Sequence, residues 1–176
     1  MDLQQDYFAL FGLPQTFDID REQLEQAYRD CQAQVHPDRH AHRNDAEKRV
    51  SMQWATHVNE AYRTLRKPLL RARYLLSLRG VDAGIETNTA MAPAFLMEQM
   101  EWREGVEEAR EGGDVSDLEH MRQRLDLHER ELRQALSGQL GDTAADGEAA
   151  ADTVRRLMFI EKLQIEIDDA LEALED

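Results

Sequence analysis

The sequence predicts an all-α protein made of two helical domains. Apolar residues recur at the 3.6-residue spacing of helices along most of the chain, and no stretch shows the alternation of a half-buried strand. A hydrophobic fraction of 41% in 176 residues is enough for a packed core. A segment with two glycines and no helical spacing follows residue 79, so we expect a domain at 1–79, a linker at 80–87 and a domain at 88–176.

The first domain is predicted to be a helical hairpin preceded by a short aromatic helix that ends at Pro14. Asp20 with Gln23 forms a capping box, and the helix that it opens must stop before Pro37. The second arm runs from about residue 45 to residue 66. The apolar stripe of the first arm consists of Leu24, Ala27, Tyr28, Cys31 and Val35, and that of the second arm of Val50, Trp54, Val58, Ala61 and Leu65.

The second domain is predicted to be a three-helix bundle, with helices at about 92–111, 115–137 and 149–174. Gly112 and Gly113 separate the first two helices, and a small, acidic stretch at 137–147 separates the last two. The middle helix carries the stripe Leu118, Met121, Leu125, His128, Leu132 and Ala135, and the last helix carries Ile160, Leu163, Ile167, Leu171 and Leu174.

The net charge of −15 is unevenly distributed along the chain. Residues 1–79 carry a charge of +1 and residues 80–176 a charge of −16, while the segment 36–79 alone carries +6. This acidity argues against nucleic acid and against an anionic membrane surface as the main ligand, because both need clustered Lys and Arg. The uneven charge therefore marks the division of the chain into two halves.

Cysteine content and targeting patterns further narrow the class of protein. The single cysteine, Cys31, excludes an intrachain disulfide and a metal site made of cysteines alone. The N-terminus lacks the basic residues of a secretory signal, and no apolar run reaches 18 residues. We expect a cytoplasmic protein without a bound cofactor or metal.

The tripeptide His36-Pro37-Asp38 occupies the polar turn between the two arms of the hairpin. Pro37 has a fixed φ and pre-orders the turn before a partner arrives. Asp38 offers a carboxylate suited to a bidentate pair with an arginine of a partner, and His36 offers a short polar ring for hydrogen bonding. These residue types present a binding loop and need not perform chemistry themselves.

With Asp-Tyr-Phe-Ala-Leu-Phe-Gly-Leu-Pro before it and Val58-Asn59-Glu60-Ala61-Tyr62 after it, this hairpin resembles the J-domain. The resemblance implies that the tripeptide docks on a DnaK-like chaperone and stimulates its ATP hydrolysis, so the chain itself would not be an enzyme. Residues 21–35 carry only two arginines, whereas J-domains usually present more basic residues there. We therefore assign the chaperone-binding charge to Arg39, Arg43, Lys48 and Arg49, which suits a dedicated, HscA-like partner.

The helix predicted at 92–111 has more apolar surface than a bundle helix needs. Phe95, Trp102, Val106 and Ala109 form one narrow stripe for the core, whereas Leu96, Met97 and Met100 lie on another side. Apolar residues rimmed by carboxylates form a plausible recognition patch, and methionine adapts to irregular partners. The alternative is that these three residues belong to the core.

Nearly the whole chain resembles the HscB branch of J-proteins, the co-chaperones of iron–sulfur cluster assembly, through Arg66–Leu78, Ala94–Glu101 and Ala151–Phe159. This resemblance implies an L-shaped co-chaperone, of the bacterial type, that carries an IscU-like scaffold protein to the chaperone. It assigns scaffold binding to Leu96, Met97, Met100, Glu101, Arg103, Glu104 and Phe159.

Two other functions stay open at this stage. A general J-protein would recruit a different client to a DnaK-type chaperone. A metal-dependent hydrolase would use His36, Asp38 and His40, although Pro37 interrupts the helix that such a zinc site would need. We also expect Cys31 to be a core residue, and Arg71 with Arg73 to lie on a solvated face.

Overall fold

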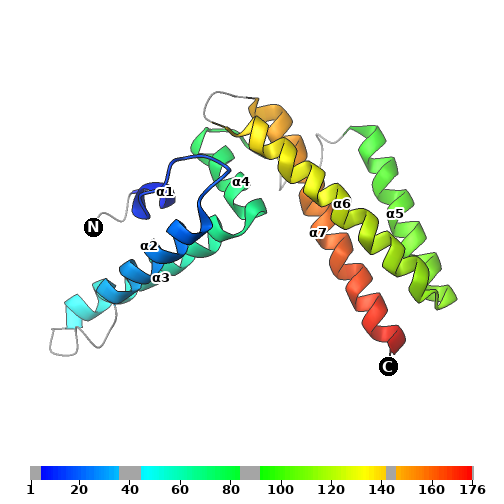
Figure 1. Cartoon of the computed structure of the whole chain (residues 1–176), viewed down its shortest axis with the longest axis horizontal. Coiled ribbons are helices and arrows are strands. Elements are labelled where there is room, and N and C mark those ends of the chain that lie inside the picture. Colours follow the sequence, from blue (N-terminus) through cyan, green and yellow to red (C-terminus); the bar gives the residue numbers. More distant parts are fainter. Residues whose placement is uncertain (1–4, 36–44, 84–91, 142–145, 176) are drawn as a thin grey trace.

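The computed structural model describes residues 5–35, 45–83, 92–141 and 146–175, and all regular structure in these ranges is helical. The helices form two limbs that meet at an angle (Figure 1). One limb holds α1 (Tyr7–Leu10), α2 (Arg21–Val35), α3 (Asp45–Arg66) and α4 (Pro68–Leu78). The other holds α5 (Pro93–Gly112), α6 (Val115–Gln139) and α7 (Gly147–Glu175). The predicted all-α, L-shaped architecture is confirmed.

Local sequence signals account for the starts of α1, α2 and α4 in the first limb. The Asp6 carboxylate accepts hydrogen bonds from the N–H groups of Phe8 and Ala9, which caps α1. Asp20 accepts the N–H of Gln23 at 3.0 Å, as expected of the predicted cap. Helix α4, which the sequence analysis did not separate from its surroundings, begins at Pro68, because proline has no N–H to lose at a first helical position.

The hairpin of α2 and α3 buries most of the predicted stripes, with Ala27 and Tyr28 only partly buried. The side chain of Val35, the last residue of the α2 stripe, lies outside the described residues. Leu24 and Cys31 on α2, and Trp54, Val58, Ala61 and Leu65 on α3, are buried together with Phe8 and Phe17. Val50 is half exposed, so its prediction as a core residue is wrong. It lies in the second turn of α3, where the opposite arm is ending and little remains to cover it.

The bundle differs from prediction in the second half of its stripes. Ala135 on α6 is exposed and Leu136 is buried, because the structure extends α6 to Gln139 and its last turns face the other limb. Leu174 is exposed in the last turn of α7. Ser137 to Gln139, predicted as part of a connection, are helical. Gly113 adopts the left-handed conformation at φ 66°, which ends α5.

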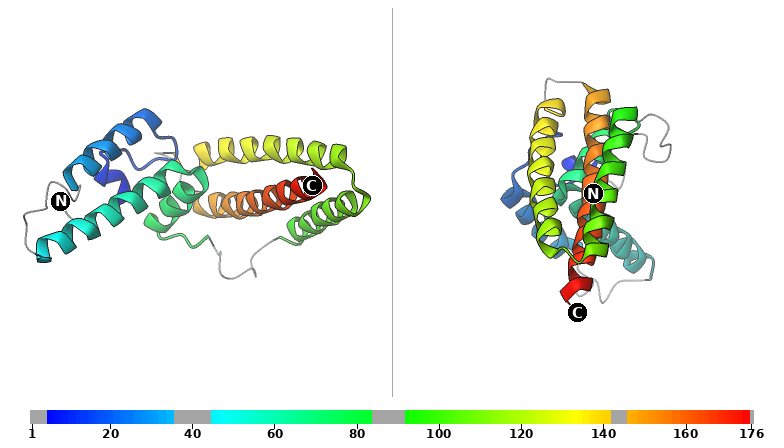
Figure 2. Two further views of the ribbon diagram at one scale, coloured as in Figure 1. Left: turned by 90° about the horizontal axis from the view of Figure 1, so that it is seen from below. Right: turned by 90° about the vertical axis from the view of Figure 1, so that its right-hand side faces the viewer.

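The two limbs share one hydrophobic core. The buried cluster of the α1–α4 limb continues into the other limb. It includes residues at the end of α6 and in the first turns of α7, namely Leu136, Leu140, Ala150, Ala151, Val154 and Leu157. In both figures, α4 lies against the start of α7 (Figures 1 and 2). A second cluster, built from α5, α6 and the rest of α7, fills the outer part of the bundle. The boundaries 1–79, 80–87 and 88–176 remain a prediction.

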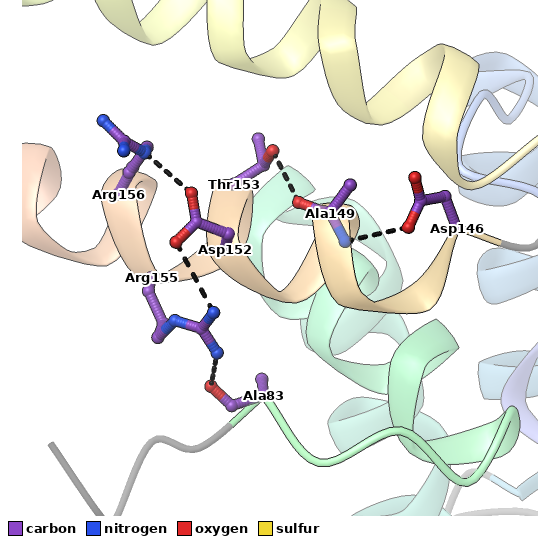
Figure 3. Close-up of polar contacts among 7 residues, drawn as sticks. All are labelled: Ala83, Asp146, Ala149, Asp152, Thr153, Arg155 and Arg156. Atoms are coloured by element: carbon purple, nitrogen blue, oxygen red, sulfur yellow. Dashed lines mark hydrogen bonds and ion pairs between the residues drawn. The ribbon is translucent and has the colours of Figure 1, made fainter. Parts of the chain in front are cut away.

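Polar groups reinforce this junction. Arg79 donates to the carbonyl of Leu140 at 3.0 Å, and Arg155 on α7 donates to the carbonyl of Ala83 at 3.1 Å (Figure 3). These bonds satisfy backbone acceptors that follow a helix end, where no intrahelical donor is available. The junction is therefore fixed by packing and by directed hydrogen bonds.

Gly147→Ala should weaken the junction. A Cβ at Gly147 would lie 2.7 Å from Cγ2 of Val81, which packs against the shared core, so residues must move apart. We expect a loss of about 1–3 kcal/mol in the free energy of unfolding by urea, the usual cost of overpacking. Gly138→Ala is the control, since a Cβ there meets nothing within 4 Å, and it should leave stability equal or slightly higher. Equal stability of Gly147→Ala and the parent would contradict this account of the junction.

Candidate functional site

The two arms of the hairpin are held together by a network of stacked rings and hydrogen bonds between α2 and α3. The rings of Tyr28 and Tyr62 stack with centroids 4.0 Å apart. Tyr28 donates its hydroxyl to the side-chain oxygen of Asn59 at 3.0 Å, and Gln32 donates to the same oxygen. Asn59 and Tyr62 belong to the stretch that resembles the J-domain, and here they fix the spacing of the arms that carry the turn.

Of the seven predicted chaperone-binding residues, only two lie within the described residues. His36, Pro37, Asp38, Arg39 and Arg43 lie outside the described residues. Lys48 and Arg49 are exposed in the first turns of α3, at the end of the hairpin where the turn begins. Their positive charge is therefore available to a partner that approaches this end.

The proposed zinc site also falls in the turn, since His36, Asp38 and His40 are outside the described residues. Within the described ranges, no group of three or more His, Cys, Asp or Glu side chains could hold a metal ion. Cys31 is buried, as predicted, and burial raises the pKa of its thiol.

The second candidate surface lies on α5, at the outer edge of the bundle (Figure 1). Phe95, Val106 and Ala109 are buried, which confirms them as the core stripe of this helix. Leu96, Met97 and Met100 are 39, 62 and 70% exposed, so the alternative that they belong to the core is wrong. Glu101, Arg103 and Glu104 are exposed beside them. We call the exposed residues Leu96, Met97 and Met100 the α5 patch.

Phe159 lies beneath this surface and not on it. It is 8% exposed on α7 and contacts Phe95 edge to face, with ring centroids 5.8 Å apart. The guanidinium of Arg103 lies over the Phe159 ring at 5.8 Å. Phe159 and Arg103 therefore join α7 to α5 beside the patch, and their direct contact with a partner remains a prediction.

A charged network borders the same end of α5. Arg156 on α7 bonds to Asp152 at 2.9 Å, approaches Glu98 of α5 at 3.5 Å and places its guanidinium 4.6 Å from the Phe95 centroid. Figure 3 shows Asp152 between Arg155 and Arg156, with Arg155 reaching Ala83. The first turn of α7 is capped by Asp146, which accepts the N–H of Ala149. The network joins α5, α7 and the exit from α4.

Asp152 makes this network sensitive to acid. Burial alone would raise the pKa of Asp152, but the hydrogen bond and charge of Arg156, with the charge of Arg155, lower it overall. Because the pKa of Asp152 is lower in the folded than in the unfolded chain, its ionised carboxylate stabilises the fold at neutral pH. This stabilisation is lost as the pH falls through the pKa of Asp152 in the folded state.

Asp152→Asn should therefore lower the free energy of unfolding at pH 7 by about 0.5–1 kcal/mol, a modest value because the carboxylate is partly exposed. The difference from the parent should shrink toward zero as the pH falls through the depressed pKa of Asp152, in urea titrations at a series of pH values. Asp169→Asn, at an exposed position of α7, should show no such trend. A pH-independent difference for Asp152→Asn would exclude the ionic explanation.

Arg71 is the clearest departure from the sequence analysis. It was predicted to lie on a solvated face, yet it is 9% exposed. It donates to the carbonyl of Leu65 and lies over the ring of Phe17 at 5.1 Å. Arg71 lies on α4, and the turn between α3 and α4 brings its side chain back to the last turn of α3.

These surfaces are suited to binding proteins. An exposed apolar patch rimmed by charge, together with a polar segment between two paired helices, is a recognition feature. No helix in the described part of the chain is long and apolar enough to cross a membrane.

Comparison with protein families divides the chain in two. Residues 6–74 match the DnaJ domain, and residues 91–168 match the HSCB C-terminal oligomerisation domain. A DnaJ domain implies an Hsp70-type chaperone as partner.

Individual proteins match the chain over its whole length. It is 65% identical to a co-chaperone protein HscB homolog of Azoarcus sp. over 100% of this chain and 99% of the relative, and 63% identical to that of Aromatoleum aromaticum over 99 and 98%. Among solved structures, the chaperone HscB of Vibrio cholerae matches with a TM-score of 0.84 and 37% identity, covering 97% of this chain and 99% of that one. The human co-chaperone protein HscB matches with a TM-score of 0.87 and 29% identity, covering 96 and 83%. The chain thus belongs to the HscB family of J-domain co-chaperones, which are not enzymes.

Proposed function

We propose that this co-chaperone binds an IscU-like iron–sulfur cluster scaffold protein through the α5 patch and presents it to an HscA-like chaperone, whose ATPase the His36-Pro37-Asp38 turn stimulates. In this role the chain assists cluster transfer in the bacterial cytoplasm. The ATP and its hydrolytic site belong to the chaperone, and the cluster belongs to the scaffold. The observation that carries the proposal is the exposure of Leu96, Met97 and Met100 on a helix whose other face is already fully used in the core.

The energetics of the patch suit a transient client. Fully burying a completely exposed side chain of this size contributes about 1.5–3 kcal/mol. Met97 and Met100 can contribute most of this amount, and Leu96, which is 39% exposed, contributes less. These side chains are bordered by the carboxylates of Glu101 and Glu104 and the guanidinium of Arg103, which favour a partner surface of complementary charge. The α5 patch and the α2–α3 hairpin belong to different limbs, so each limb can engage a different protein (Figure 2).

A co-purification experiment tests this function. The full chain, tagged and incubated with lysate of its source organism, should retain an IscU-like scaffold together with an HscA-like chaperone, identified by mass spectrometry. A general J-protein would instead retain a general DnaK with other clients and no cluster scaffold. Absence of the scaffold, when the chaperone is retained, would overturn the assignment of the client.

A further inference from the structure

A strongly basic cavity lies where the two limbs meet. Its volume is about 630 Å³, within the range of small-ligand sites. Side chains from α2, α3, α4 and α6 line it, and none of the lining residues is acidic. Its basic residues are Arg21, Arg63, Arg66, Lys67, Arg71 and Arg133. Such a concentration of positive charge is notable in a protein of net charge −15.

Much of this charge is not neutralised within the protein. Arg63, Arg66 and Lys67 are exposed and form no ion pair with any residue that the structure describes. The carboxylates of Asp18 and Glu161 act on Arg71 and Lys67 through their charge, without an ion pair, and Asp18 accepts a hydrogen bond from Ser137 instead. Arg21 and Arg133 do have partners, namely Glu25 and Glu129.

Arg71 is the buried member of the set. The side chain is about nine-tenths buried, and its Nε has no hydrogen-bond partner among the described residues. Burial lowers the pKa of Arg71 to about 10, because the guanidinium loses water and the charge of Asp18 offsets only part of that loss. An anion in the cavity would offset this cost by supplying the missing negative charge.

The start of α4 adds a further positive feature. Lys67 and Pro68, which begin this 11-residue helix, line the cavity. The Lys67 side chain makes no capping hydrogen bond, and the first turn contains no acidic residue. The N–H groups and dipole of this helix end are therefore uncompensated, which favours an anion.

We propose that this cavity is a binding site for a compact, multivalent oxyanion of the phosphate class. Cations converge on the cavity from several helices and do not follow one line, so a small anion with several oxygens can meet more of them at once than an extended acidic chain can. Because the cavity combines Arg133 of α6 with residues of the other limb, the bound anion would also link the two limbs. None of the residues that line this cavity belongs to the α5 patch or to the His36-Pro37-Asp38 tripeptide.

Isothermal titration of the full chain with inorganic pyrophosphate, at constant ionic strength set with sodium chloride, tests the site. The parent should bind one pyrophosphate per chain, and Arg63→Gln with Lys67→Gln should weaken binding at least tenfold. Both residues are exposed, so the double variant should keep its fold, which circular dichroism can verify. Arg110→Gln, an exposed arginine on α5 outside the cavity, should bind as the parent does. No binding by the parent, or equal binding by the double variant, would overturn the proposal.

Two further ligands identify the source of the anion. If ATP binds with the same affinity as pyrophosphate, the site recognises the phosphate groups alone. If ATP binds more tightly, the site recognises a nucleotide. Either result supports the proposal. A peptide of eight glutamates that binds more tightly than pyrophosphate, with the same loss in the double variant, would contradict it in favour of an acidic protein segment. Neither scaffold nor chaperone is present in these titrations, so their outcome is independent of the proposed client function.

Discussion

Asp38→Ala should abolish stimulation of the chaperone's ATPase and leave binding of the scaffold unchanged. Asp38 lies in the sequence between α2 and α3, whose spacing is fixed by Tyr28, Tyr62 and Asn59. Removing one partner of a charge-assisted pair at an interface typically costs about 2–5 kcal/mol, enough to reduce stimulation more than tenfold at a fixed concentration. Single-turnover ATP hydrolysis by the purified HscA-like chaperone measures the effect.

A matched carboxylate elsewhere controls for net charge. Asp169 is exposed on α7, in the other limb, and Asp169→Ala should stimulate the ATPase as the parent does. If Asp38→Ala stimulated as strongly as the parent, the turn would not be the element that acts on the chaperone.

Leu96→Ala combined with Met100→Ala should weaken scaffold binding by about a hundredfold. Each truncation removes apolar surface that we expect the scaffold to cover, at about 0.8 kcal/mol for every CH₂ group buried. Both side chains are exposed in the free protein and alanine favours helix, so helicity and stability should stay the same. Isothermal titration with the purified scaffold gives the affinity, and circular dichroism gives the helicity.

Two other exposed apolar residues of the bundle provide the control. Leu127 on α6 and Ile165 on α7 are 54 and 60% exposed, so Leu127→Ala with Ile165→Ala removes comparable surface. This pair should leave the scaffold affinity unchanged. A hundredfold loss in the control pair and none in the α5 pair would move the client surface away from α5.

Most of the architecture could be predicted from local pattern. The spacing of Phe95, Val106 and Ala109 identified the buried face of α5, and it thereby left Leu96, Met97 and Met100 for the surface. The cap at Asp20 could be predicted from the residue types alone. Such features depend on contacts within one helix, for which the 3.6-residue repeat is a sufficient guide.

Features that depend on contacts between helices could not be predicted in this way. Val50 is exposed, and Leu136 is buried in place of the predicted Ala135, because the burial of each turn depends on which neighbouring helix covers it. The burial of Arg71 depends on the fold of the α3–α4 turn, because a basic residue has no sequence signal for burial beneath a helix end. The shared core likewise brings residues far apart in the chain, such as Phe8 and Val154, into one buried cluster, which no local pattern encodes.

The candidate sites show the same division. The residues of the α5 patch were identifiable because α5 carries more apolar side chains than its core-facing stripe can bury. Phe159 was expected to reach the surface, whereas its edge-to-face contact with Phe95 places it in the core. Its supporting role, like that of the Asp152 network, depends on the packing of α7 against α5.

The central claim is that one chain connects two proteins through two surfaces on different limbs. If so, the parent and scaffold together should stimulate the chaperone's ATPase more than the sum of their separate effects. The decisive measurement mixes two defective chains, Asp38→Ala and the double variant Leu96→Ala with Met100→Ala, in one ATPase assay with scaffold and chaperone. We predict that the mixture stays at the level of the separate variants, because neither chain carries both surfaces. Restoration of the parent's stimulation by the mixture would show that the two surfaces need not be on one molecule, and would contradict the account.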